Sequence, residues 1–213
     1  MSDMGLTVKK LNIEEVAILR KTRESTVEVE LALEAGESKP NTGYAFLDHM
    51  VETMGRWGCF TIRLQMEANR RLSHMIAEDS GIALGSALRE LSRKRIEELG
   101  INCIGFAYAA LDEALSEAVV SIEGRANAYI EAACEGGQAE RVEDSSKNDL
   151  KAFIEGLAQG WSSTIHVRIL SGRDPHHSWE SAFRALGIAI SNSLEENPSR
   201  KGEVAGLKSY FGA

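Results

Sequence analysis

The clearest regular pattern in this chain is an alternation of apolar and polar residues in two short segments, at 26–33 and 61–66. In TVEVELAL the apolar residues fall at every second position, and TIRLQM repeats that period, which is typical of half-buried β-strands. Between them, GYAFLDHMVETMGRWG carries apolar residues at a helical spacing, such as Phe46, Met50 and Met54, and ends at a glycine. The pattern predicts the order strand, helix, strand.

The rest of the chain continues with further strands and helices. The segment from His74 to Leu99 is rich in Ala, Leu, Glu and Arg and stops at Gly100, as expected for a long helix. The same criteria predict two strands, a helix, a strand and the start of a last helix, at 118–122, 126–132, 148–160, 163–170 and 172–190. The second half therefore follows the plan of the first.

Two of the helical segments match in detail, which predicts an internal duplication. HMIAEDSGIALGSAL aligns with HHSWESAFRALGIAI, so that His74 matches His176 and Glu78 matches Glu180 at a constant offset of 102 positions. An Ala-Leu-Gly tripeptide recurs at the same offset. We expect a single compact unit whose two halves and N-terminal extension cover about residues 20–105, 106–202 and 1–19.

Composition places the chain among ordinary globular proteins. Of its 213 residues, 43% are hydrophobic and 26% are charged, and the net charge of −8 disfavours a nucleic-acid surface. There is no apolar run of about 18 residues, and the N-terminus has no continuous apolar segment of the export type. We therefore expect a cytoplasmic protein that binds neither membranes nor nucleic acid. Its 3 cysteines, an odd number at wide spacing, favour reduced thiols over a disulfide framework.

The candidate chemistry lies in the two aligned helix starts. Each has a histidine followed four residues later by a glutamate, His74 with Glu78 and His176 with Glu180, which brings both side chains to one face of a helix. Each pair then forms half of a metal site, and His177, one position further round the helix, can serve the other metal. Mixed imidazole and carboxylate ligands suit Mn²⁺, Fe²⁺ or Zn²⁺.

Two simpler interpretations of these pairs remain open. Exposed helices often carry His and Glu four residues apart as a solvated pair, and buried histidines are often satisfied by hydrogen bonds without a metal. Here the pair recurs at duplicated positions beside a histidine doublet, in a chain with only 5 histidines. That recurrence favours a catalytic metal site.

A series of motifs resembles the imidazoleglycerol-phosphate dehydratase family of histidine biosynthesis. In order from about Arg20 to Gly202, the motifs are RKTRESTVEVEL, TGYAFLDHMVETMGRWGCF, SHMIAEDSGIALGSAL, LDEALSEAVVSIEGR, STIHVRILSGRDPHHSWESAFRAL and NPSRKG. The most specific are FLDHM, DEAL followed by GR, and HHxxE followed by PSxKG.

This resemblance implies an α+β fold, internally duplicated, in which two four-stranded, mostly antiparallel sheets enclose a four-helix layer. It implies a metal-dependent hydro-lyase that converts imidazoleglycerol phosphate to imidazoleacetol phosphate with two Mn²⁺ ions in each active site. Two cations beside the imidazole ring lower its pKa and stabilise the negative charge that develops when a carbon-bound proton is removed. The resemblance also implies a homo-oligomer of twenty-four subunits built from trimers, with active sites between subunits.

By the same resemblance, the metal ligands are His49, His74, Glu78, His166, His176, His177 and Glu180. One complete set consists of His74, Glu78, His166 and His177, and the other combines the remaining three with the residue after His74. The expected catalytic carboxylates are Glu24, Glu78 and Glu180. The expected phosphate-binding residues are Arg125, Arg184, Ser199 and Lys201, whose donors suit a phosphate dianion.

Several positions depart from the family motifs. Ala110 and Trp57 replace a family proline and a family histidine, and the loop before His74 lacks the family's aspartates. Two further departures concern the metal ligands and the phosphate-binding residues. The residue after His74 is Met75, where the family has a second histidine, and a thioether is a poor ligand for Mn²⁺. We therefore expect one intact Mn²⁺ site and one weakened site. Cys103 stands in place of a family arginine that binds phosphate. These departures leave open a second interpretation, a divergent paralogue that acts on or binds a different phosphorylated or imidazole-like ligand.

Overall fold

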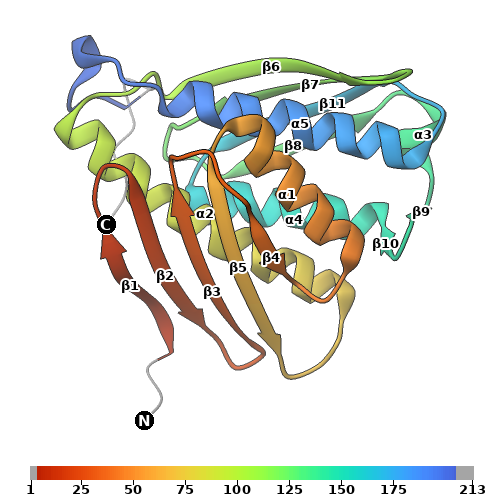
Figure 1. The fold of residues 1–213 in the computed structure, drawn as a ribbon, viewed down its shortest axis with the longest axis horizontal. Coiled ribbons are helices and arrows are strands. Elements are labelled where there is room, and N and C mark those ends of the chain that lie inside the picture. The colour runs from red at the N-terminus through yellow and green to blue at the C-terminus, as the bar shows by residue number, and fades with distance from the viewer. Residues whose placement is uncertain (1–3, 205–213) are drawn as a thin grey trace.

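The structure, a computed structural model that describes residues 4–204, consists of two β-sheets with helices between them (Figure 1). In spatial order, the first sheet contains β1 (Gly5–Leu11), β2 (Glu15–Lys21), β3 (Ser25–Ala32), β5 (Thr61–Ala68) and β4 (Lys39–Asn41). The second contains β6 (Ile104–Leu111), β7 (Ala114–Ser121), β11 (Thr164–Ser171) and β8 (Asn127–Ala132). Neighbouring strands are antiparallel except in the pairs β4–β5 and β8–β11, which are parallel.

The layer between the sheets is formed by the long helices α1 (Ala45–Gly58), α2 (Ser73–Glu98), α4 (Lys147–Trp161) and α5 (Pro175–Leu194). Helices α1 and α2 pack on the first sheet and α4 and α5 on the second, while α2 meets α4 and α1 meets α5 (Figure 1). The smaller elements are α3 (Glu135–Gln138), β9 (Arg141–Val142), β10 (Ser145–Ser146) and a 3-10 turn (Pro198–Arg200). The predicted α+β sandwich is confirmed. Within residues 4–204, none of the helices has the length and apolar character needed to span a membrane.

The first sheet has five strands, one more than the resemblance implied. Residues 5–11 and 15–21 form β1 and β2, so most of the segment expected as an N-terminal extension belongs to this sheet. Val16 and Ile18 of β2 are fully buried in the core, whereas every residue of β1 is exposed. Because no residue of β1 is buried, the segment carries no strong apolar period from which a strand could be predicted.

The two halves share one topology. The order β2-β3-β5-β4 in the first sheet corresponds to β6-β7-β11-β8 in the second, including the single parallel pair at the edge. In each half the last of these four strands in sequence, β5 or β11, is preceded by one helix and followed by a longer one. This correspondence is consistent with the duplication inferred from the offset of 102 positions.

Glycines let the helices of the two halves touch backbone to backbone. A Cβ atom at Gly85 of α2 would lie 2.3 Å from the carbonyl oxygen of Leu157 in α4. A Cβ atom at Gly187 of α5 would lie 2.2 Å from the carbonyl oxygen of Met54 in α1. Gly85 and Gly187 are equivalent in the repeat, so both helix pairs approach closely at equivalent positions. The second contact holds α1 against α5.

Candidate metal centre

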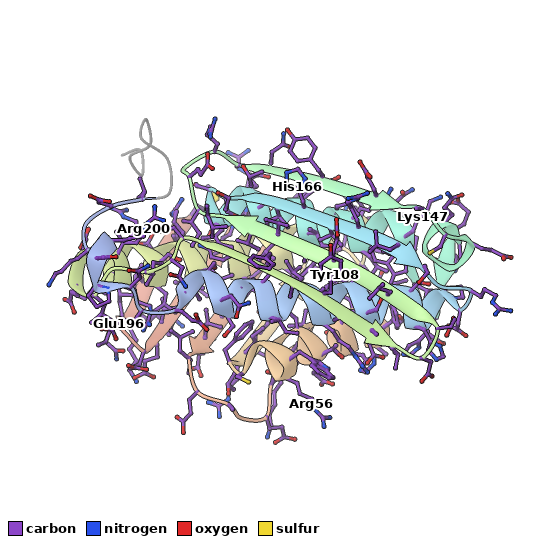
Figure 2. The ribbon with its side chains drawn as sticks, turned by 90° about the horizontal axis from the view of Figure 1, so that it is seen from above. Arg56, Tyr108, Lys147, His166, Glu196 and Arg200 are labelled. Carbon is purple, nitrogen blue, oxygen red and sulfur yellow. The ribbon has the colours of Figure 1, made fainter. Side chains whose placement is uncertain are left out.

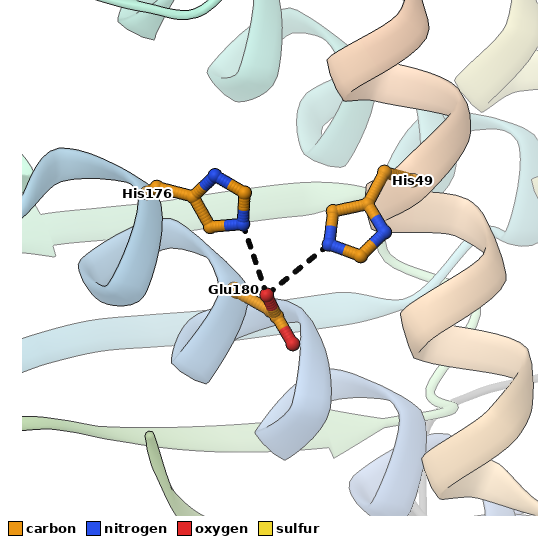
Figure 3. Close-up of side chains that lie close together, drawn as sticks. All are labelled: His49, His176 and Glu180. Carbon is orange, nitrogen blue, oxygen red and sulfur yellow. Dashed lines mark hydrogen bonds and ion pairs between the residues drawn. The ribbon is translucent and has the colours of Figure 1, made fainter. Parts of the chain in front are cut away.

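Three of the predicted ligands meet where α1 lies against α5 (Figure 3). The Nε2 atoms of His49 and His176 each lie 3.1 Å from Oε2 of Glu180. One ligand atom from each of the three side chains can be chosen so that all lie within 4.8 Å of one another. Two imidazole nitrogens and a carboxylate oxygen at this separation fit a divalent cation such as Mn²⁺, Fe²⁺ or Zn²⁺.

The start of α5 fixes the histidine doublet. Asp174 is the N-cap residue, and its carboxylate accepts hydrogen bonds from the backbone N–H groups of His176 at 2.7 Å and His177 at 3.2 Å. Pro175 occupies the first turn, where its missing N–H costs no hydrogen bond. The helix therefore begins just before the doublet, and Glu180 follows one turn after His176.

Glu180 is buried, with 8% of its surface exposed. Burial raises the pKa of its carboxyl group, but hydrogen bonds and charges from Arg184 and His49 outweigh this effect and leave the pKa below its ordinary value. The closest of these contacts is 2.6 Å, from Nη2 of Arg184 to Oε1 of Glu180. The carboxylate is therefore ionised, as a metal ligand must be.

His177 faces a different carboxylate from its neighbour. Its Nδ1 lies 2.9 Å from Oε2 of Glu113, and hydrogen bonds from the backbone of Asp174, from His177 and from the backbone of Arg173 lower the pKa of Glu113 to about 2. Glu113 in turn raises the pKa of His177. Glu113 is the glutamate of the DEAL motif, but it was not predicted as a site residue.

The other predicted ligands are spread over the fold. His74 is exposed and Glu78 half-buried at the start of α2, and no hydrogen bond joins them among the described residues. His166 lies on the outer face of β11, where its ring stacks on Tyr129 with the ring centroids 4.7 Å apart (Figure 2). Between residues 4 and 204, the cluster around Glu180 is the one group of three or more potential ligands found close together.

Glu24 and Met75 border the same depression. It has a volume of about 450 Å³ and is also lined by Arg23, Asn69, Arg70 and Leu72. Glu24 lies in the turn between β2 and β3, and Met75 lies in the first turn of α2. A candidate acid–base group and the residue in place of a family histidine are therefore neighbours.

The predicted phosphate-binding residues come from separate segments. Arg125, in the turn before β8, is exposed and forms an ion pair with Glu123. Ser199 of the 3-10 turn donates a hydrogen bond to the side chain of Asn197, the residue before that turn, and Lys201 follows the turn directly. Cys103 is fully buried, and its thiol carries no positive charge with which to bind a phosphate.

Known proteins similar to this chain share one description. The sequence profile of the family described as imidazoleglycerol-phosphate dehydratase matches residues 42–190. The imidazoleglycerol-phosphate dehydratase of Nitrosococcus oceani is 33% identical over 193 residues, covering 90% of this chain and 95% of its own. The enzyme of the same name from Saccharomyces cerevisiae is 35% identical over 187 residues, covering 84% of this chain and 82% of its own.

Solved structures of the same description have a similar fold. The crystal structure from Pyrococcus furiosus matches with a TM-score of 0.70 at 31% identity, covering 90% of this chain and 98% of that one. The crystal structure from Staphylococcus aureus matches with a TM-score of 0.73, covering 86% of this chain and 99% of that one. At 22% identity, the second similarity concerns the fold alone.

Proposed function

The chain belongs to the imidazoleglycerol-phosphate dehydratase family, and from that premise we propose that it removes water from its substrate with a centre of divalent metal ions, Mn²⁺ in particular. It is a hydro-lyase of histidine biosynthesis that converts imidazoleglycerol phosphate to imidazoleacetol phosphate. A divergent paralogue with another ligand is not favoured, because relatives with this one activity match across 90% of the chain.

The observation that carries the proposal is the cluster of His49, His176 and Glu180. These side chains offer two imidazole nitrogens and one ionised carboxylate within 4.8 Å, the donor set that Mn²⁺ accepts. These residues would hold a divalent ion, whose positive charge would stabilise the negative charge that develops on the substrate when a carbon-bound proton is removed. The three residues lie on two helices whose packing is fixed by the core, so the ligands are held in place before the metal binds.

We assign the second metal to His74, Glu78, His166 and His177. These four come from α2, β11 and α5 and form no group within the described part of one chain, so a neighbouring copy is needed to complete the set. The outer face of the second sheet supports such assembly, because two large apolar side chains are exposed on it, Phe106 at 67% and Tyr108 at 62%. Tyr108 and His166 lie on this same face (Figure 2). The proposed state is a homo-oligomer of twenty-four subunits built from trimers.

Met75 makes the two metal sites unequal. The resemblance assigns its position to the same site as His49, His176 and Glu180, and its thioether binds Mn²⁺ poorly. We therefore expect the set of His74, Glu78, His166 and His177 to bind Mn²⁺ tightly and the set that includes Met75 to bind it weakly.

Loss of water requires a base that takes the carbon-bound proton and an acid that protonates the departing hydroxyl. We assign both roles to Glu24, which borders the depression beside Met75. Its carboxylate takes the carbon-bound proton, and the resulting carboxylic acid gives a proton to the hydroxyl, which leaves as water. Glu78 and Glu180 act in catalysis as metal ligands. The substrate phosphate is bound by Arg125, Ser199 and Lys201, whereas Arg184, expected with them, already bonds Glu180 and Ala110 within the chain.

The proposed partner is a small phosphorylated imidazole compound. Neither a nucleic acid nor a membrane is expected as a partner, because the net charge is −8. Phosphorylated intermediates do not cross membranes freely, so we propose a cytoplasmic location for the enzyme.

Elemental analysis tests the metal centre and the role of Met75 together. The protein is purified without chelator, incubated with Mn²⁺ and freed of excess ion, as wild type, Met75→His and His49→Ala. We expect one retained ion per chain in the wild type, two in Met75→His and one in His49→Ala, with dehydratase activity in the wild type. Wild type that retains two ions would contradict the role of Met75, and wild type that retains none would contradict tight binding at the set that includes His74. Met75→His that retains only one ion would contradict the metal centre at His49, His176 and Glu180.

A further inference from the structure

The two carboxylate oxygens of Glu180 have different partners. Oε2 receives both imidazoles, at 3.1 Å from His49 and 3.1 Å from His176. Oε1 accepts two hydrogen bonds from Arg184, from Nη2 at 2.6 Å and from Nε at 3.1 Å. Figure 3 shows Oε2 between the two rings, with the other oxygen pointing away from them. One oxygen is thus directed to the metal ligands and the other is held by the guanidinium.

The guanidinium of Arg184 is itself held by the protein. Besides its two bonds to Glu180, Nη1 donates to the carbonyl oxygen of Ala110 at 3.1 Å. Its central carbon lies 4.8 Å from the centre of the Trp57 ring, a cation–π contact. The side chain is 17% exposed. All three guanidinium nitrogens donate to protein oxygens, which leaves few N–H groups free to bind a substrate phosphate.

We propose that Arg184 is a positioning residue for Glu180, and that Trp57 in turn fixes the plane of its guanidinium. Arg184 acts through the carboxylate and does not bind the substrate phosphate. Its fork of N–H groups holds Oε1, so that Oε2 stays between His49 and His176. The role rests on the proposed metal centre at these residues.

A lysine at position 184 would not orient the carboxylate of Glu180 in the same way. Its ammonium is a point charge on a flexible chain, so it can pair with Glu180 or with Ala110 but has no rigid fork to orient the carboxylate, and no planar group to stack on Trp57. A phosphate-binding cation, in contrast, can be a lysine as well as an arginine. The substitution Arg184→Lys therefore separates the two roles.

The experiment titrates Mn²⁺ into metal-free wild type, Arg184→Lys and Trp57→Ala and follows the heat of binding. The relevant site is recognised because His49→Ala abolishes it. We expect the Kd of this site to rise at least about tenfold in Arg184→Lys, as for other groups that orient metal ligands, with a lower kcat and an unchanged KM for the substrate. Trp57→Ala should raise the Kd less, and should add nothing in the Arg184→Lys background.

Arg63→Lys is the matched control, because Arg63 pairs with Glu30 at 3.2 Å on the exposed face of the first sheet. It should bind Mn²⁺ as the wild type does. A wild-type Kd in Arg184→Lys together with a raised KM would overturn the proposal and restore a phosphate-binding role. If Arg184→Lys fails to fold, a wild-type Kd in Trp57→Ala overturns it instead. Wild type that binds no Mn²⁺, with no change in His49→Ala, overturns the metal centre itself.

Discussion

Asp144 caps helix α1 from the other half of the chain: its Oδ1 accepts a hydrogen bond of 3.0 Å from the backbone N–H of Phe46, 98 residues away. Oδ2 accepts a second hydrogen bond, of 2.6 Å, from the backbone N–H of Ala45. The residue at the N-cap position of α1, Tyr44, makes no side-chain cap of its own. A carboxylate of the second half therefore completes the helix that carries His49.

Removing this cap should weaken both stability and metal binding. We expect Asp144→Ala to lower the free energy of unfolding by about 1 kcal/mol, the usual value of an N-cap, and to weaken Mn²⁺ binding at His49. Asp144→Asn keeps one acceptor oxygen, so both its free energy of unfolding and its Mn²⁺ affinity should lie between those of the wild type and of Asp144→Ala. Urea denaturation measures the first effect and calorimetric titration the second. Glu140→Ala, which removes an exposed carboxylate from the same region, should change neither.

Glu113 should control the protonation of His177. With Glu113→Gln, we expect the raised pKa of His177 to fall toward its ordinary value of 6.5, in a proton NMR titration of the metal-free protein. A His177 pKa that does not move would mean that the contact with Glu113 is absent in solution.

The two pKa shifts determine how the contribution of this pair to folding stability changes with pH. Protonated His177 stabilises the fold fully below pH 6.5, and this contribution is lost as pH rises through its higher pKa in the folded state. Ionised Glu113 stabilises the fold fully above pH 4.5, the ordinary pKa of its carboxyl group. This contribution is lost as pH falls toward its pKa in the folded state, about 2. In the metal-free protein the pair therefore stabilises most between pH 4.5 and 6.5.

The contact between α2 and α4 should not tolerate a single added carbon. A Cβ atom at Gly81 would lie 2.1 Å from the carbonyl oxygen of Phe153, a backbone atom that cannot move without its helix. We expect Gly81→Ala to lower the free energy of unfolding by about 1–3 kcal/mol. Lys94→Ala, on the same helix but in a partly exposed ion pair with Glu98, should change this free energy by less than about 0.5 kcal/mol. Equal denaturation midpoints for the two variants would contradict this packing.

The exposed face of the second sheet should be needed for assembly. We expect Phe106→Glu and Tyr108→Glu to shift the protein to smaller species in analytical ultracentrifugation, because each places a charge in an apolar contact between copies. Gln65→Glu, on the exposed face of the first sheet, is the control and should sediment as the wild type does. Unchanged sedimentation of both glutamate variants would place the interface elsewhere.

The sequence predicted several elements whose apolar period has one buried face, although β2, which buries Val16 and Ile18, was not predicted as a strand. The period of two in β3 and β5 and the helical spacing of α1 gave elements within a few residues of those observed. Neither β1 nor β6 was predicted, for opposite reasons. No residue of β1 is buried, whereas β6 carries apolar residues on both faces. Its outward residues Ile104, Phe106 and Tyr108 are themselves apolar, so the alternation of IGFAYAAL is hidden.

The candidate site divides in a similar way. His176 and Glu180 are one helical turn apart, so the sequence alone placed them on one face, and the structure brings them to 3.1 Å. The equivalent spacing of His74 and Glu78 gave no such contact. His49 entered the ligand set only through family resemblance, and Glu113, Asp144 and the contact of Trp57 with Arg184 were not predicted.

By itself, the sequence determined what depends on near neighbours: the period of several strands and helices, and the i to i+4 spacing that puts His176 and Glu180 on one face of a helix. Backbone geometry fixes these within a few residues. Only the tertiary structure decided that His49 lies 3.1 Å from Glu180 across 131 positions of sequence. That distance depends on how closely α1 approaches α5, which is set by the fit of buried surfaces around Gly187 and Met54 and has no local signal in the chain.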